Sequence, residues 1–238
     1  MSVEKGKVYL IPTTLGDTAE TADVIPLKVN LIINTIDEYI VENEKSARHY
    51  LKKMGLKKSL QEIILHPLNT RTHPSEISSY LKSIQDGKSI GIISEAGCPG
   101  IADPGAEVVK LAHANNITVV PLVGPSSILL ALIASGFNGQ NFAFNGYLPK
   151  ERPDRIKKIK DLEKLIFSKE QTQLFIETPY RNMHILEDLL YTCDAKTKLC
   201  IACDITLPTE FIKTKNIGDW KNKIPDINKK PTIFLIYK

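Results

Sequence analysis

The sequence has few of the features that mark specialised classes of protein. It contains four cysteines and one tryptophan in 238 residues, and no apolar run approaches the ~20 residues that a membrane-spanning helix requires. The opening residues, MSVEKGKVYLIP, have neither the apolar core nor the small-residue cleavage site of a secretory signal peptide. These absences argue against a disulfide scaffold, a membrane protein and a secreted protein. We therefore expect a cytoplasmic protein in a reducing compartment.

The cysteines do not form the pattern of a metal site. Cys200 and Cys203 make a CxxC pair, but no second pair and no nearby pair of histidines completes the four ligands that zinc takes. The pair lies in the apolar run LCIACDI, which has the composition of a strand. A three-residue offset places two strand side chains on opposite faces. We predict no metal site and interpret both cysteines as small buried apolar side chains.

Two nucleotide-binding fingerprints are also absent. No GxGxxG spacing marks a dinucleotide site and no GK[ST] marks a P-loop, so a nicotinamide-dependent oxidoreductase is disfavoured. Basic residues exceed acidic ones by 31 to 27, a net charge of +4. This mild excess permits a nucleic-acid partner without requiring one.

The chain does contain a regular alternation of strand-like and helical patterns, and hydrophobic residues make up 42% of it, enough for a sizeable core. Apolar, β-branched runs predict strands at residues 7–11, 31–34, 39–41, 62–65, 89–93, 118–122, 142–144, 173–177, 199–204, 209–213 and 232–237. Helical spacing predicts helices at residues 46–54, 75–85, 106–115, 126–135, 154–167 and 180–191. Interleaved strands and helices predict the α/β class with a largely parallel sheet. A Gly-Pro turn after the strand ending at residue 122 predicts two α/β domains, residues 1–122 and 123–238, with the ligand cleft between them.

The strongest functional signal is the segment SEAGCPGIADPG, residues 94–105, which we call the second loop. It holds three glycines and two prolines and exceeds the ~2–6 residues of an ordinary connection. Glycine opens backbone conformations closed to other residues and proline fixes its own φ, so we expect a rigid loop with exposed backbone donors. Asp103 and Pro104 suit the N-cap and first position of the next helix, which gives Asp103 a structural role first.

Two further turns follow predicted strands. The first loop, PTTLGD at residues 12–17, offers Gly16 for close approach of a ligand and Asp17 as an acceptor, although an ordinary polar turn explains it when taken alone. The third loop, GPSS at residues 124–127, opens a helix with two hydroxyl groups and free N–H groups, which suit a polar or anionic group. Ligands of α/β sheets bind at the carboxyl ends of strands, where all three loops are expected.

In this order and spacing, the three loops resemble the tetrapyrrole methylase superfamily. They look most like its branch that methylates a cytidine ribose 2′-oxygen in small-subunit ribosomal RNA. The matching segments are KVYLIPTTLGD, SEAGCPGIADPG, VPLVGPSSILLALIASG, FNGYLPK and FIETPYR. The resemblance implies a two-domain α/β fold, S-adenosylmethionine held in the interdomain cleft, a homodimer, and ribosomal RNA or the small ribosomal subunit as partner.

Carried over position by position, the resemblance also implies a set of site residues. The expected cofactor-binding residues are Leu15, Gly16, Cys98, Pro99, Ile101, Ser126, Ser127 and Glu177. Methyl transfer by in-line displacement requires mainly alignment of the acceptor and exclusion of water. A ribose hydroxyl has a high pKa, so a base should help, and the carboxylates in the right segments are Glu42, Glu95 and Glu177. A solvated or cofactor-positioning carboxylate explains each of them at least as well.

The acceptor side departs from the branch more than the cofactor side does. Asn43 stands where the branch has an aspartate, Tyr180 where it has a histidine, and Cys203 where it has an arginine. A methyltransferase for a tetrapyrrole precursor or other small acceptor, and a non-catalytic cofactor-binding relative, therefore stay open as alternatives. The basic segment of residues 150–160 is either an RNA phosphate patch or a solvated helix face. Its basic side chains are Lys150, Arg152, Arg155, Lys157, Lys158 and Lys160.

Overall fold

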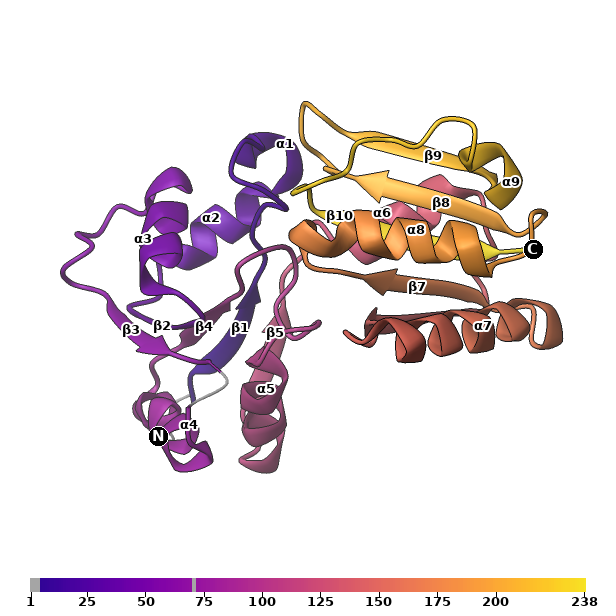
Figure 1. The fold of residues 1–238 in the computed structure, drawn as a ribbon. Coiled ribbons are helices and arrows are strands. Elements are labelled where there is room, and N and C mark those ends of the chain that lie inside the picture. Colours follow the sequence, from indigo (N-terminus) through magenta and orange to yellow (C-terminus); the bar gives the residue numbers. More distant parts are fainter. Residues whose placement is uncertain (1–4, 70–71) are drawn as a thin grey trace. The chain divides into compact units, whose positions relative to one another are not determined.

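A computed structural model describes residues 5–69 and 72–238 of the protein. The chain divides into two compact units, Met1–Ser126 and Ser127–Lys238, which are described separately below (Figure 1). Each unit contains a five-stranded sheet with helices packed on it, so the predicted α/β class is confirmed. In the described parts of the chain, no helix is long and apolar enough to cross a membrane.

The first unit alternates strands and helices from end to end. Its elements are β1 (Lys7–Ile11), α1 (Thr21–Val24), α2 (Leu27–Ile33), β2 (Glu38–Val41), α3 (Glu44–Lys53), β3 (Ile64–Pro67), α4 (Pro74–Tyr80), the 3₁₀ helix η1 (Lys82–Asp86), β4 (Ile90–Ile93), α5 (Gly105–Ala114) and β5 (Thr118–Pro121). The strand order is β3-β2-β4-β1-β5, and every neighbouring pair is parallel. The predicted parallel sheet is correct for this unit.

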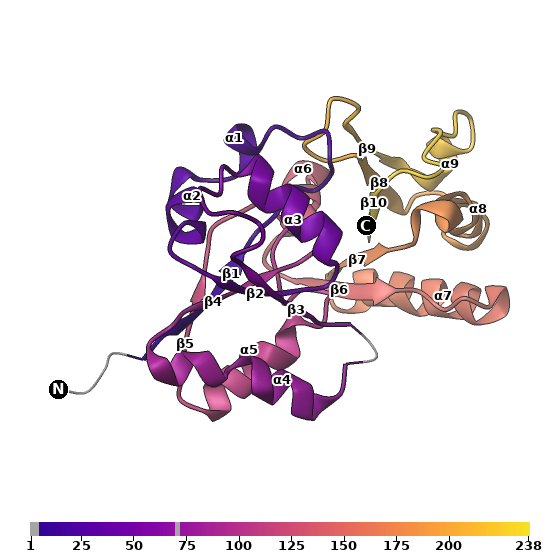
Figure 2. The same ribbon diagram turned by 90° about the vertical axis from the view of Figure 1, so that its left-hand side faces the viewer.

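Both faces of the first sheet are covered. Helices α2 and α3 lie on one face and α4 and α5 on the other (Figure 2). Along β2, Tyr39 and Val41 join the cluster beneath α2 and α3, whereas Ile40 joins the cluster beneath α4 and α5. Successive strand side chains point to opposite faces, so a strand covered on both sides is apolar throughout. This explains why the strands of this unit occur as continuous apolar runs.

The predicted strand at residues 31–34 is wrong, because these residues belong mostly to helix α2. Val29 and Ile33 are buried, while Leu27 and Leu31 are exposed, which is the four-residue periodicity of an amphipathic helix. The run LIIN is short and apolar, and over so few residues periodicity cannot separate a strand from one buried turn of helix.

The second unit has a different sheet. Its elements are α6 (Ser127–Ser135), β6 (Phe142–Tyr147), α7 (Arg152–Ser168), β7 (Thr172–Ile176), the 3₁₀ helix η2 (Pro179–Arg181), α8 (Asn182–Thr192), β8 (Lys198–Cys203), β9 (Phe211–Asn216), α9 (Ile217–Trp220) and β10 (Thr232–Tyr237). The order is β6-β7-β10-β8-β9, in which β6 and β7 are parallel and the other pairs antiparallel. The expectation of a largely parallel sheet is therefore wrong for this unit. Only seven residues, 204–210, separate β8 from β9, too few for a parallel crossover.

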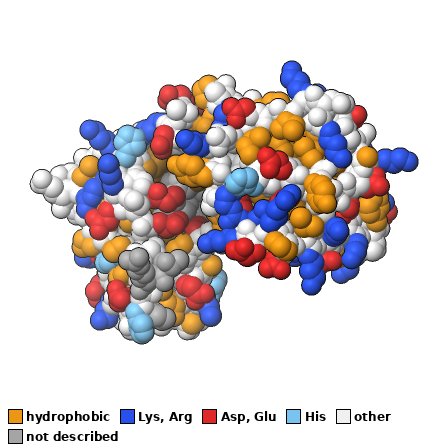
Figure 3. Space-filling view, in the orientation of Figure 1, with side chains coloured by type: hydrophobic (Ala, Val, Ile, Leu, Met, Phe, Trp, Pro, Cys, Tyr) orange, Lys and Arg blue, Asp and Glu red, His pale blue; other side chains and the backbone are white. Residues whose placement is uncertain are grey.

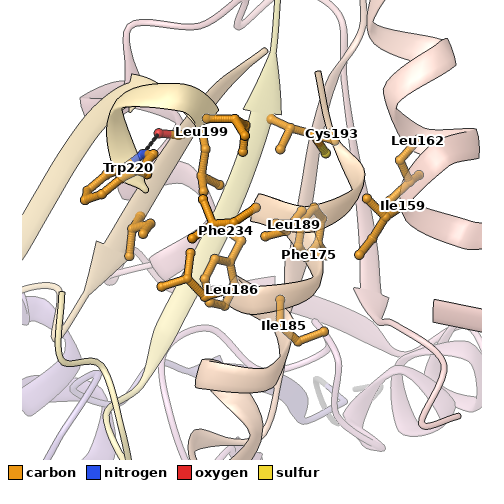
Figure 4. Packing of buried hydrophobic residues seen from close by; sticks show 14 of the residues in the cluster. Ile159, Leu162, Phe175, Ile185, Leu186, Leu189, Cys193, Leu199, Trp220 and Phe234 are labelled. Carbon is orange, nitrogen blue, oxygen red and sulfur yellow. Dashed lines mark hydrogen bonds between the residues drawn. The ribbon is translucent and has the colours of Figure 1, made fainter. Parts of the chain in front are cut away.

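A large apolar cluster fills one side of the second sheet, under α7, α8 and α9 (Figure 4). The rings of Phe175 and Phe234 stack at 5.9 Å, and the Trp220 indole N–H donates to the Leu199 carbonyl oxygen over 2.9 Å. A buried indole with a satisfied N–H keeps its apolar area without losing a hydrogen bond. Helix α6 packs against the remaining side, on β8, β9 and β10.

Candidate active site

The predicted loops of the first unit share one edge of its sheet. Strands β1, β2, β4 and β5 run parallel, so their carboxyl ends lie at the same edge. The first loop follows β1, the second follows β4, and the third begins three residues after β5. Strands β1 and β4 are adjacent, and the chain leaves them in opposite directions, toward β2 and β5. Such a switch point is where open α/β sheets bind ligands.

The first and second loops are joined by short hydrogen bonds. The Thr13 N–H donates to the Gly97 carbonyl oxygen (2.9 Å), and the Thr13 hydroxyl donates to the Ser94 carbonyl oxygen (3.3 Å). The Ser94 hydroxyl donates to the same Gly97 carbonyl (3.2 Å). All three residues are buried, so these bonds are protected from water and hold the two loops in a fixed relation.

The second and third loops meet through Cys98 and two glycines. The Cys98 thiol donates toward the carbonyl oxygens of Gly124 (3.7 Å) and Pro125 (3.4 Å), and burial raises the pKa of this thiol. A Cβ on Gly124 would lie 2.1 Å from the Cβ of Pro12, and one on Gly97 would lie 3.1 Å from both Leu15 and the Pro125 carbonyl. Glycine is thus required at both positions for the three loops to approach one another.

The expected cofactor residues of the first unit gather at this junction. Leu15 lies against Gly97, and Cys98 lies against the third loop. Pro99 is buried, whereas Ile101 is about half exposed at 49%. The remaining predicted residues of this unit, Gly16 and Ser126, are partly buried. Ser127 is the first residue of α6 and belongs to the second unit.

Asp103 holds the second loop against its own helix. Its carboxylate accepts from the Gly100 N–H with both oxygens (2.9 and 2.8 Å) and from the Gly105 N–H (2.7 Å). Helix α5 begins at Gly105, one residue later than the N-cap prediction placed it, with Pro104 at the N-cap position. The structural role predicted for Asp103 is correct, because the carboxylate satisfies a free N–H of the first turn.

Two candidate carboxylates lie side by side at the same edge. Glu42 follows β2 and accepts from the Glu95 N–H (3.4 Å), while the Glu95 carboxylate accepts from the Ser46 hydroxyl (2.9 Å). Burial raises the pKa of Glu42, and the negative charges of Asp103 and Glu95 raise it further; the Glu95 N–H opposes them. A carboxyl with a raised pKa is better suited to accept a proton than an ordinary one.

Sequence reasoning missed two polar residues of this site, Ser46 and Tyr50. Both line a cavity of about 60 Å³ together with Thr13, Ser94 and Glu95, and the Tyr50 hydroxyl donates to the Pro12 carbonyl oxygen (2.6 Å). Their spacing of four places them on one face of α3. That spacing was visible in the sequence, but nothing there indicated that this face meets the first and second loops.

The third candidate carboxylate, Glu177, belongs to the second unit, just after β7. It is buried, and its oxygens accept from the Thr178 N–H (2.7 Å) and from the Arg181 guanidinium (2.6 Å). The charge of this carboxylate is therefore balanced by an arginine of the same motif, FIETPYR.

The described residues contain no group of three or more histidine, cysteine, aspartate or glutamate side chains placed to hold a metal ion. Cys200 and Cys203 are free and buried on β8, and burial raises the pKa of both thiols. Their interpretation as buried small side chains is confirmed.

Comparison with curated proteins gives a consistent result. Over 234 residues the chain is 29% identical to ribosomal RNA small subunit methyltransferase I of Buchnera aphidicola subsp. Schizaphis graminum, covering 97% of this chain and 78% of that protein. The protein of the same name from Escherichia coli O157:H7 is 27% identical over 215 residues, 90% of this chain and 71% of the relative. The Synechocystis protein of that name is 30% identical over 202 residues, 84% of this chain and 67% of the relative. The chain belongs to the ribosomal RNA small subunit methyltransferase I family.

Membership of the ribosomal RNA small subunit methyltransferase I family makes the chain a methyltransferase, which confirms the predicted reaction class and decides against a nicotinamide oxidoreductase. No family model matches the chain. Solved structures of two methyltransferases have the same fold as the chain. The methyltransferase CobJ superposes with a TM-score of 0.64 at 16% identity, covering 98% of this chain and 94% of that one. Cobalt precorrin-4 methyltransferase, CbiF, has a TM-score of 0.62 at 16% identity, covering 97% and 94%.

Proposed function

We propose that this chain transfers the methyl group of S-adenosylmethionine to a ribose 2′-hydroxyl of a cytidine in small-subunit ribosomal RNA. The observation that carries the proposal is the junction of the three loops at the carboxyl edge of the first sheet. The relatives in the family, which bear the name ribosomal RNA small subunit methyltransferase I, support the acceptor. We infer a cytoplasmic homodimer whose chain has two domains, residues 1–122 and 123–238, as the sequence predicts.

The first unit fits the methyl donor by the shape of its backbone. Gly97 and Gly124 let the three loops pack directly against one another, and the second loop is held rigid by Thr13 and Asp103. Leu15, Gly16, Cys98, Pro99, Ile101, Ser126 and Ser127 would hold the donor. When bound, S-adenosylmethionine supplies a sulfonium methyl group that leaves by in-line displacement. The loops then serve to orient the donor and exclude water.

Glu42 is the carboxylate best suited to take the proton of the acceptor hydroxyl. Burial raises the pKa of Glu42, and the hydrogen bond that its carboxylate accepts from the Glu95 N–H is long, at 3.4 Å. Glu95 instead accepts the shorter bond of Ser46, at 2.9 Å. We assign Glu42 the role of base. The N–H of Glu95 positions Glu42, and Glu177, which is paired with Arg181, positions the cofactor.

Calorimetric titration with S-adenosylmethionine tests the donor first. Binding with one site per chain is expected. If no heat of binding is measured at millimolar ligand, the proposal is wrong. Methyl transfer to small ribosomal subunits purified from a strain that lacks the gene tests the acceptor. Label in the RNA at a cytidine 2′-oxygen supports the proposal. Label in a tetrapyrrole precursor alone identifies the small-acceptor alternative, and label in neither identifies the non-catalytic relative.

The base is tested by Glu42→Gln with Glu95→Gln as its partner variant. A general base contributes about 10²- to 10⁴-fold to a rate, so the first variant should lower the methyl-transfer rate within that range while it still binds S-adenosylmethionine. The Glu95→Gln variant should lower the methyl-transfer rate less, because it keeps the backbone N–H that donates to Glu42. Equal rates for wild type and Glu42→Gln would remove Glu42 from the mechanism.

A further inference from the structure

The second unit contains a cavity of about 630 Å³, within the range of small-molecule sites, ~300–1,000 Å³. It lies where β6, β7, η2 and the start of α7 meet. The charged and polar side chains that line it are Tyr147, Lys150, Lys158, Glu177, Thr178 and Arg181. Three cations and one anion give the lining a net charge of +2.

The structure gives the basic side chains of residues 150–160 different surroundings. Arg152 and Arg155 bind one buried aspartate, Asp188 of α8, at 2.8 and 2.7 Å. Lys150 and Lys158 line the cavity instead. The sequence left a phosphate patch and a solvated face as alternatives. The exposed Lys157 and Lys160 fit the solvated face, and the phosphate patch stays a prediction.

The buried arginine fixes the loop that carries Lys150. The Arg155 guanidinium donates to the carbonyl oxygens of Lys150 (2.6 Å) and Pro149 (3.3 Å) while Asp188 holds its other side. A guanidinium that is buried and bonded in this way cannot swing away, because both its charge and its donors are satisfied where they are. The backbone that presents Lys150 to the cavity is thus anchored to α7 and α8.

Within the part of the chain that the structure describes, the two lysines of the cavity have no such partner. Arg181 pairs with Glu177 at 2.6 Å, so these two charges balance. Among the residues that the structure describes, no carboxylate forms an ion pair with Lys150 or Lys158. Lys158 is partly buried, and its neighbours on the same helix, Lys157 and Lys160, are exposed. Lysine and arginine side chains gather on the surface over α7 and α8 (Figure 3).

An aromatic ring borders the same cavity. Tyr147, at the end of β6, is 60% exposed although it lines the cavity wall. Exposed rings beside cations are the usual means of holding single-stranded nucleic acid, because a base stacks on the ring while the cation contacts the phosphate. A carboxylate ligand would use the lysines but would have no need of the ring.

We propose that this cavity binds a phosphodiester of the RNA acceptor, with Lys150 and Lys158 on the phosphate and Tyr147 stacked on a neighbouring base. The proposal rests on the proposed function, since it concerns the acceptor of that reaction. It adds a binding site in the second unit to the donor loops of the first.

The test measures binding of a fluorescein-labelled 12-nucleotide RNA of mixed sequence between 50 and 200 mM NaCl. Each single-strand phosphate contact contributes about 0.7 to the slope of log K against log salt. The double variant Lys150→Ala/Lys158→Ala should therefore lower the slope by about 1.4 and weaken binding about 10-fold or more at low salt. The matched control, Lys157→Ala/Lys160→Ala, removes the same charge from the exposed face and should change the slope by less than half as much.

A second pair of variants tests the ring. Tyr147→Ala should weaken RNA binding about 10-fold without changing the salt slope, because stacking releases no counterions. Tyr147→Phe keeps the ring and should bind as the wild type does. Thermal unfolding of every variant shows whether it is folded.

Three outcomes overturn the proposal. Equal slopes for the two lysine double variants would make the binding a general charge effect. Equal affinities for Tyr147→Ala and wild type would remove the ring from the site. Binding of uroporphyrin III in place of the RNA, lost in Lys150→Ala/Lys158→Ala, would assign the cavity to a polycarboxylate. Calorimetry with S-adenosylmethionine on the same proteins is independent of these results, so a failure of the donor site is distinguished from a failure of the cavity.

Discussion

The two units build their candidate sites by different physical means. In the first unit, backbone groups of three loops bind one another, and glycines allow the loops to approach closely. In the second unit, charged side chains form the candidate site: Asp188 and Arg155 anchor a loop, and Lys150 and Lys158 line a cavity. Backbone shape suits one fixed ligand, whereas side-chain charge suits a flexible polyanion. The contrast matches a methyl donor for the first unit and an RNA chain for the second.

The largest effect is expected in the second unit, from Asp188→Asn. The change leaves the buried Arg155 guanidinium without its counter-charge, and breaking one partner of a buried pair costs about 3–5 kcal/mol. Chemical denaturation measures the loss of unfolding free energy. The control is Asp161→Asn, which removes an exposed ion pair with Lys164 and should cost no more than about 1 kcal/mol. Equal losses in both variants would show that the buried pair is not the anchor we infer.

The next effect is expected in the first unit, from Gly124→Ala. The new Cβ would lie 2.1 Å from Pro12, so the first and third loops must separate. A misplacement of about 1 Å in a positioning element can cost 10²-fold in rate, and we expect at least that loss of methyl transfer together with weakened S-adenosylmethionine binding. Gly139→Ala is the control, because nothing lies within 4 Å of its added Cβ. Wild-type binding by Gly124→Ala would place the donor elsewhere.

A smaller effect is expected from Gly100→Ala in the second loop. Gly100 has φ +87° and open space around it, so alanine meets strain of about 1–2 kcal/mol but no clash. Calorimetry should show roughly 10-fold weaker S-adenosylmethionine binding with the fold retained. Gly100→Val should abolish binding, because a branched side chain adds to the strain. If both variants bind as the wild type does, the second loop does not hold the donor.

The smallest effect concerns the pH dependence of stability through Glu42. Burial and the neighbouring carboxylates raise the pKa of Glu42 above its ordinary value of 4.5, so the folded state binds a proton more readily than the unfolded chain. Stability then decreases as the pH rises through the window between the two pKa values. Glu42→Gln should match the wild type below that window and unfold about 1–2 °C higher above it. The expectation is contradicted if the difference in unfolding temperature between Glu42→Gln and the wild type is the same at pH 4 and at pH 8.

Much of the first unit could be predicted from its sequence. Continuous apolar runs mark its strands because both faces of the sheet are covered, and the overlong glycine- and proline-rich run at residues 94–105 marks the site. Residues 31–34 could not be assigned, because one buried helical turn and a short strand have the same composition. Ser46 and Tyr50 could not be placed in the site, because only the packing of α3 brings them to the loops.

Less of the second unit could be predicted. Strand β10 lies between β7 and β8, far from both in sequence, and local patterns carry no information about such pairings. The six basic residues of the segment 150–160 look alike in sequence. Arg155 becomes a buried anchor because it meets Asp188, which lies 33 residues away in the sequence.

The sequence by itself predicted the reaction class, through the resemblance of its motifs to a methyltransferase family, and the three loops that we propose hold the donor. Glycine, proline and capping residues act locally, so their order along the chain is enough to predict such loops. The tertiary structure alone decided which polar groups meet. It joined Thr13 to Gly97, placed Glu42 beside Glu95, and set Lys150 and Lys158 into a cavity while Arg155 was buried. These contacts join residues far apart in sequence, and they form because the apolar faces of strands and helices must be buried, which brings distant loops together.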